Sequence, residues 1–69
     1  MTLRELREKA GWTQITIAVE LNVTQSAISV WDRGLNPPLK KYRPALCEAY
    51  RCTMEELEAA IEESRRRKP

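Results

Sequence analysis

The chain has no histidine and no phenylalanine, and only two of its 69 residues are cysteines. Without histidine, no zinc site with Cys/His ligand spacing can be drawn, and the commonest general acid–base group of enzymes is missing. The sequence also has no glycine-rich phosphate loop and no nucleophile motif, and its acidic residues form no paired site. These absences argue against an enzyme, and we expect neither a cofactor nor a bound metal.

Long apolar segments are missing as well. No run of about 18 apolar residues occurs, so the sequence predicts no segment that spans a membrane. The N-terminal residues TLRELREK lack the apolar stretch of a secretory signal, and we therefore expect a cytoplasmic protein. A disulfide between Cys47 and Cys52 is not expected in a reducing compartment, and both cysteines are interpreted as small buried residues.

The short length of the chain limits it to one domain. It is close to the size at which a single hydrophobic core suffices, so self-association would help to stabilise it. Apolar residues make up 42% of the sequence, which is enough to fold, but strand-like alternation and internal repeats are both lacking. The sequence predicts a compact all-α domain over residues 1–64 and a basic, disordered tail over residues 65–69.

Five segments have helical periodicity of their apolar residues and recognisable ends. Capping boxes begin the first and the last of them, at Thr2-Leu3-Arg4-Glu5 and Thr53-Met54-Glu55-Glu56. Pro37 and Pro38 exclude a helix or a sheet between the third and fourth segments. The expected helices cover about residues 3–10, 14–21, 24–33, 41–50 and 54–64.

The segment from Thr13 to Gly34 is predicted to form two short helices joined by a tight turn. Thr13 and Thr24 are residues of the type that caps helix N-termini. Asn22 lies where the chain must reverse, and asparagine tolerates the left-handed backbone conformation that such a turn uses. Two helices joined in this way have the signature of a helix-turn-helix motif.

The helix expected after Thr24 has two different faces. Apolar residues occupy one side, and Trp31 among them is interpreted as a core residue. The other side carries mostly small or polar residues: Gln25, Ser26, Ser29, Val30 and Arg33. A small, hydrogen-bonding helix face fits the major groove of DNA, so the sequence predicts a module that reads double-stranded DNA.

The net charge of +2 hides an uneven distribution of charge along the chain. Residues 33–43 include no acid and four bases: Arg33, Lys40, Lys41 and Arg43. Residues 55–63 include no base and five acids: Glu55, Glu56, Glu58, Glu62 and Glu63. We therefore expect DNA phosphates to be bound by the basic residues in the middle of the chain. Asp32 lies close to this basic stretch and is expected to pair with a nearby basic residue or to cap locally.

Several short motifs, in their order and spacing, resemble the helix-turn-helix family of the phage Cro and CI repressors, also called the XRE family. The resemblance covers roughly residues 2–62. It is carried by Leu3-Arg4-Glu5-Leu6-Arg7, Thr13-Gln14, Ala18, Val23-Thr24-Gln25-Ser26, Ile28-Ser29, Trp31-Asp32-Arg33-Gly34, the prolines of the following loop, and Met54-Glu55-Glu56-Leu57. It implies a five-helix, lambda-repressor-like domain that binds operator DNA, commonly as a homodimer, and that regulates transcription, here as a repressor.

The resemblance also implies roles for individual residues. In this family the second helix of the motif lies in the major groove, with its N-terminal residues at base edges. By position, Gln25 and Ser26 become the main base readers, with Ser29 and Val30 further along the same face. Glutamine can bond adenine through two hydrogen bonds. Phosphate contacts are expected from Gln14, Thr24, Arg33, Lys40, Lys41 and Arg43. Capping alone would also explain Thr24.

Several positions depart from the family pattern. Asn22 and Arg51 stand where glycine is common; the first is harmless, whereas the second should strain or alter a helix end. Val30 replaces a long polar residue, which removes one contact and can substitute a methyl contact with thymine. Ile15 and Val19 stand at positions that are usually polar. They form a candidate surface for a protein partner, although chance exposure explains them equally well.

Two other functions remain open at this point. A DNA-binding antitoxin would share the fold and the DNA surface and would neutralise a partner toxin, and Ile15 and Val19 would be the first surface to test. A helical module that binds only protein would keep the fold without the DNA. Val30 and the modest net charge favour this module slightly, and salt-dependent binding to DNA would exclude it.

Overall fold

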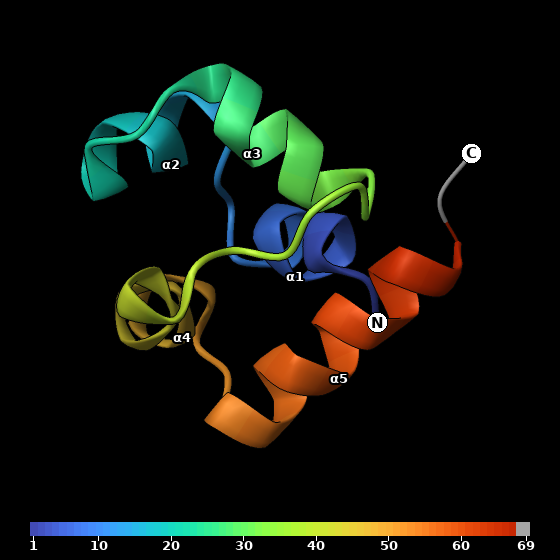
Figure 1. Ribbon diagram of the computed structural model, residues 1–69. Helices are drawn as coiled ribbons and strands as arrows, with labels where there is room; N and C mark the ends of the chain where they lie inside the picture. The colour runs from blue at the N-terminus through green and yellow to red at the C-terminus, as the bar shows by residue number, and fades with distance from the viewer. Residues whose placement is uncertain (68–69) are drawn as a thin grey trace.

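The computed structural model describes residues 1–67 as helices joined by short loops (Figure 1). The elements are α1 (Leu3–Lys9), α2 (Gln14–Leu21), α3 (Gln25–Asp32), a 3₁₀ turn η1 (Lys40–Tyr42), α4 (Arg43–Tyr50) and α5 (Met54–Arg66). Residues 1–67 contain no strand, and the predicted all-α class with five α-helices is confirmed. Within the same residues, no helix is long and apolar enough to cross a membrane.

Threonine side chains begin four of the helices. The hydroxyls of Thr2, Thr13, Thr24 and Thr53 each accept a hydrogen bond from a backbone N–H three residues later. The two predicted capping boxes are confirmed, and Thr13 forms a third one with the hydroxyl of Thr16. An N-cap of this kind contributes about 1 kcal/mol. Local sequence therefore fixes where these helices begin.

Two helices end at a residue with left-handed backbone geometry. Asn22 ends α2 with φ 57° and ψ 46°, which confirms the predicted reversal between α2 and α3. Arg51 ends α4 with φ 56° and ψ 48°, and its N–H donates to the carbonyl of Cys47. Arg51 thus keeps the cap geometry that is typical of glycine. Because Arg51 has a side chain, this left-handed backbone conformation costs roughly 1–2 kcal/mol.

The core lies where the five helices converge. Its buried members are Leu3, Leu6, Ile17, Ala18, Ile28, Trp31, Leu46, Tyr50, Leu57 and Ala60. Trp31 is only 8% exposed, which confirms that it is a core residue and leaves it unable to stack on a base. Helix α1 packs against α3, α4 and α5, and it runs through the centre of the molecule in Figure 1.

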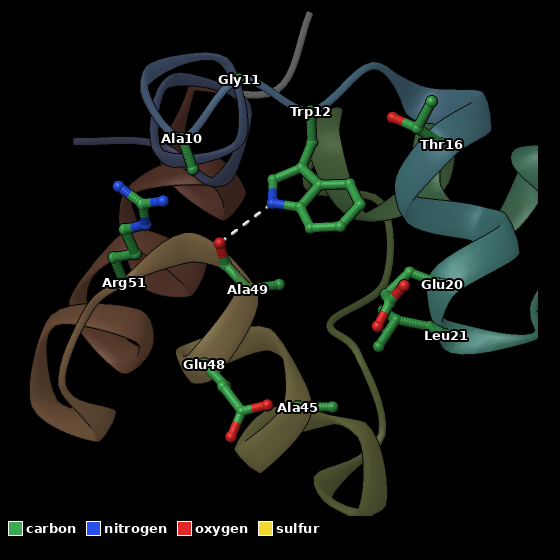
Figure 2. A pocket seen from close by; sticks show the side chains of 10 residues that line it. All are labelled: Ala10, Gly11, Trp12, Thr16, Glu20, Leu21, Ala45, Glu48, Ala49 and Arg51. Atoms are coloured by element: carbon green, nitrogen blue, oxygen red, sulfur yellow. Dashed lines mark hydrogen bonds between the residues drawn. The ribbon is translucent and has the colours of Figure 1, made fainter.

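Trp12 joins the α1–α2 corner to α4. Its indole N–H donates to the carbonyl of Ala49 at 2.9 Å, and the ring lies in a hollow between α2 and α4 (Figure 2). Glu20 from α2 and Glu48 from α4 line the same hollow. The hydrogen bond satisfies the one polar atom of a half-buried ring, and it ties the α1–α2 corner to α4.

The C-terminal part of α5 holds the start of α1. The buried hydroxyl of Ser64 accepts from the backbone N–H of Leu3 at 2.8 Å and donates to the carbonyl of Ala60 at 2.8 Å. The N-terminal ammonium of Met1 lies 2.8 Å from the carboxylate of Glu63. Sequence analysis missed Ser64, because a serine between charged residues near a chain end carries no signal of burial.

Helix α5 continues further than expected, and this corrects the boundary placed at residue 65. Arg65 and Arg66 belong to α5, whereas Lys68 and Pro69, also assigned to the tail, lie outside the described residues. Glu62 pairs with both arginines, at i+3 and i+4, and Glu63 pairs with Arg67 at 3.0 Å. Such pairs, and basic side chains at a helix C-terminus, stabilise the last turn.

Helix α4 begins at Arg43 rather than at the expected residue 41. Residues 40–42 form the separate 3₁₀ turn η1, and Pro44 occupies the first turn of α4 as predicted. Proline lacks a backbone N–H, so it cannot extend an earlier helical turn but fits the start of a new one.

Gly34 is predicted to be the less replaceable of two glycines with positive φ. A Cβ at Gly34 (φ +71°) would lie 2.0 Å from the carbonyl oxygen of Ser64, whereas one at Gly11 (φ +87°) would meet nothing within 4 Å. Gly11→Ala should cost about 1–2 kcal/mol of unfolding free energy for its backbone conformation alone. Gly34→Ala should cost about 1–3 kcal/mol more, because α5 must move. Urea denaturation of both variants measures the difference, and equal losses would contradict the close approach.

A second prediction concerns pH and the half-buried thiols. Cys47 and Cys52 are free cysteines. Both were expected to be buried, but the structure shows them half-buried. Burial, and then the neighbouring Cys47, raise the pKa of Cys52 to about 11 from 9.0. The folded state therefore holds this proton more tightly, and that contribution to stability should be lost as pH rises from 9.0 to about 11. Denaturation under reducing conditions should show a smaller loss in Cys52→Ala; an equal loss would contradict the raised pKa.

Candidate nucleic-acid interface

The predicted contact face begins at the first turn of α3. Gln25 and Ser26 are exposed there, whereas Ser29 one turn later is half-buried. The hydroxyl of Thr24 is 3.1 Å from the backbone N–H of Ala27 and accepts its hydrogen bond as a cap. Helices α2 and α3 pack against each other at one end of the molecule, so the exposed start of α3 lies beside that of α2 (Figure 1).

Gln14, the first residue of α2, lies next to Gln25. The side-chain Nε2 of Gln25 is 3.4 Å from Oε1 of Gln14, across 11 residues of sequence. The turn at Asn22 makes this contact possible, because it folds α3 back against α2. The structure thus brings together one predicted phosphate contact and one predicted base contact as a directly bonded pair of amides.

A buried ion pair lies directly behind these two glutamines. Arg7 Nε donates to Asp32 Oδ2 at 3.0 Å, and the two side chains are 8% and 5% exposed. Arg7 Nη1 also donates to the carbonyl of Trp12 at 2.8 Å. Gln14 Nε2 donates to the same Asp32 oxygen at 3.2 Å. Asp32 thus pairs with a basic residue, as expected, but this residue is Arg7 on α1 and not one of the bases that follow Asp32 in the sequence.

Arg7 was not identified as buried in advance, although the sequence held the signal. Leu3, Leu6 and Ala10 mark the inner face of α1, and Arg7 lies on that face because it is four residues after Leu3. The ion pair also affects Tyr50. Burial raises the pKa of Tyr50, the negative charge of Asp32 raises this pKa further, and the positive charge of Arg7 lowers it. Arg7, Asp32 and Tyr50 therefore share one desolvated polar region.

Val30 does not lie on an open polar face. It is half-buried and packs against the edge of the core. It also lines a shallow hollow in which Pro37 and Leu39 lie alongside α3, together with Thr24 and Ser26. The loop after Gly34 therefore covers part of the surface next to Val30, which sequence analysis could not place.

The four predicted basic contacts have different surroundings. Lys40 and Lys41 are exposed in η1, and Lys41 Nζ lies 5.1 Å from the ring centroid of Tyr42. Arg33 is exposed, and its Nε is 3.4 Å from the carbonyl of Ser29. Arg43 is half-buried and donates from Nε to the carbonyl of Pro38 at 3.2 Å, so it braces the loop.

The Arg7–Asp32 pair is predicted to stabilise the fold far more than an exposed pair on the same helix. Asp32→Ala leaves a buried guanidinium without its partner and should lower the unfolding free energy by about 3–5 kcal/mol. The matched control is Arg4→Ala, since Arg4 is 67% exposed and pairs with Glu8 at 3.2 Å. Its loss should be below about 1 kcal/mol. Chemical denaturation measures both, and similar losses would contradict the burial of the pair.

Comparison with known protein families gives one match. The family model described as helix-turn-helix matches residues 3–57, a range that includes every residue predicted to contact DNA. Neither the comparison with curated proteins nor that with solved structures finds a match. Among residues 1–67, no three His, Cys, Asp or Glu side chains gather closely enough to hold a metal ion.

Proposed function

The chain belongs to the helix-turn-helix family of the Cro and CI repressors and is a DNA-binding regulator, and from that premise we propose that it represses transcription by binding operator DNA as a homodimer. The observation that carries the proposal is the exposed, polar first turn of α3, which the left-handed turn at Asn22 places beside the first residue of α2. In this family's docking geometry, that turn of α3 is the part that enters the major groove.

Base reading is assigned to Gln25 and Ser26, with Ser29 and Val30 as secondary contacts. Gln25 and Ser26 are exposed at the start of α3 and have no core contacts to lose by turning toward a base. Ser29 and Val30 are half-buried, so only part of each side chain is available. A methyl group of Val30 is suited to the methyl of thymine.

Phosphate contacts would fix the orientation of α3 in the groove. Gln14 begins α2, where unpaired backbone N–H groups favour an anion. Lys40 and Lys41 follow the loop that lies alongside α3, and their charges are exposed. Arg33, Arg43 and Thr24 are also assigned to phosphates. Arg43 keeps further N–H donors beyond the one bonded to Pro38. Such contacts supply affinity and register without sequence information.

A homodimer would present two copies of α3 to two half-sites. The described chain is small, with a Cα radius of gyration of 10.4 Å, and spans only one half-site. Dimers of this family bind half-sites about 34 Å apart, one helical turn of DNA. The proposal therefore expects an operator with two-fold symmetry.

Titration of operator variants at two salt concentrations should separate base reading from phosphate binding. The operator is first selected from a random pool of duplexes. Gln25→Ala should cost about 1–3 kcal/mol and relax specificity at one base position. Lys41→Ala should weaken binding to all sequences alike and reduce the salt slope by about 1.

Lys9→Ala is the matched control for Lys41→Ala, because Lys9 is exposed on α1 and lies outside the proposed contacts. It should leave the salt slope unchanged. Equal weakening of every sequence by Gln25→Ala would contradict base reading. A chain without salt-dependent DNA binding would overturn the whole proposal in favour of a protein-binding module.

One observation favours a second candidate, a DNA-binding antitoxin. Ile15 and Val19 are 59% and 76% exposed on one side of α2, an unusual placement for two β-branched apolar residues. A toxin could cover them while α3 binds DNA. A protein that copurifies with the wild type but not with an Ile15→Ser, Val19→Ser double variant of unchanged DNA affinity would support this candidate.

A further inference from the structure

A line of hydrogen bonds connects the interior of the protein with the exposed start of α3. Arg7 Nε donates to Asp32 Oδ2 at 3.0 Å, and Gln14 Nε2 donates to the same oxygen at 3.2 Å. Gln14 Oε1 in turn accepts from Gln25 Nε2 at 3.4 Å. Every bond in this line has a direction, because each nitrogen donates and each oxygen accepts.

The direction of the line is set at its buried end. The side chain of Asp32 is 5% exposed and faces the guanidinium of Arg7, and a carboxylate can only accept hydrogen bonds. Gln14 must therefore turn its NH2 group toward Asp32 and its oxygen toward Gln25. Gln25 must then give one of its two N–H donors to Gln14. This leaves Gln25 with one donor and one acceptor facing outward.

One donor and one acceptor match adenine but not guanine in the major groove. Adenine presents an acceptor at N7 and a donor at its N6 amino group, whereas guanine presents two acceptors, N7 and O6. A glutamine with both N–H donors free could serve guanine instead. The hydrogen bond to Gln14 removes that option.

Resting on the proposed function, we propose that Asp32 is a positioning residue that makes Gln25 select adenine over guanine. Asp32 acts without touching DNA, by fixing the orientation of the Gln14 amide. The buried pair with Arg7 thereby contributes to sequence specificity as well as to stability.

The test is the ratio of affinities for adenine and guanine at one base position. That position is identified by Gln25→Ala, as the one where base substitution no longer matters. The wild type should prefer adenine over guanine there by about 5- to 150-fold, the range of a single good contact. Gln14→Ala and Asp32→Ala, which leave no Gln14 amide at all or no acceptor for it, free the Gln25 amide, and both should bring the ratio within about twofold.

One further variant separates amide orientation from general damage. Glu8→Gln removes another carboxylate near Arg7, at 4.0 Å from Nη2, that is not bonded to Gln14. It should keep the wild-type ratio.

The outcomes distinguish this inference from the function on which it rests. A wild type that binds no DNA overturns both. A wild type that binds DNA without preferring adenine at this position overturns the inference alone, as does a full adenine preference in Gln14→Ala or in folded Asp32→Ala. If Asp32→Ala fails to fold, NMR of the wild type decides. A nuclear Overhauser effect should join the Gln14 Nε2 protons to the Arg7 Nε proton, and its absence overturns the inference.

Discussion

The buried ion pair between Arg7 and Asp32 is the interaction on which both the packing and the candidate interface depend. It joins α1 to the end of α3, and Arg7 also binds the carbonyl of Trp12 at the α1–α2 corner. A charge pair of this kind is stabilising only when its remaining donors and acceptors are used. Here Gln14 donates a hydrogen bond to the same Asp32 oxygen, and this bond connects the buried pair with the surface at the start of α2.

Local sequence predicted the helices well because their ends are made by local contacts. Threonine caps, the capping boxes at Thr2 and Thr53, and the left-handed Asn22 depend on residues within four positions along the chain. The misplaced boundaries have local causes too. They are the proline that starts α4 afresh and the ion pairs of Glu62 that prolong α5.

Contacts between distant segments could not be predicted in the same way. Ser64 is bonded to Leu3 across 61 residues, and Gly34 lies so close to Ser64 that no side chain fits between them. Nothing near either residue in the sequence signals its partner. Arg7 is an intermediate case, because its position on the inner face of α1 was readable but its acidic partner was not.

In the candidate interface, too, the features set by local sequence were predictable and the contacts between distant segments were not. The faces of α3 followed from helical periodicity, so the burial of Trp31 and the exposure of Gln25 and Ser26 agree with the sequence. The loop after Gly34 has no periodicity, and its position beside Val30 and its brace from Arg43 needed the structure. Base and phosphate roles remain predictions, since they depend on DNA geometry as well as on this fold.

The most direct test of the central claim is NMR titration of the labelled protein with its selected operator duplex. If the exposed start of α3 enters the major groove, the largest shifts should fall on Gln14, Gln25 and Ser26, including the side-chain amides of both glutamines. Shifts confined to Ile15 and Val19, or to the C-terminal end of α5, would contradict this account of the interface.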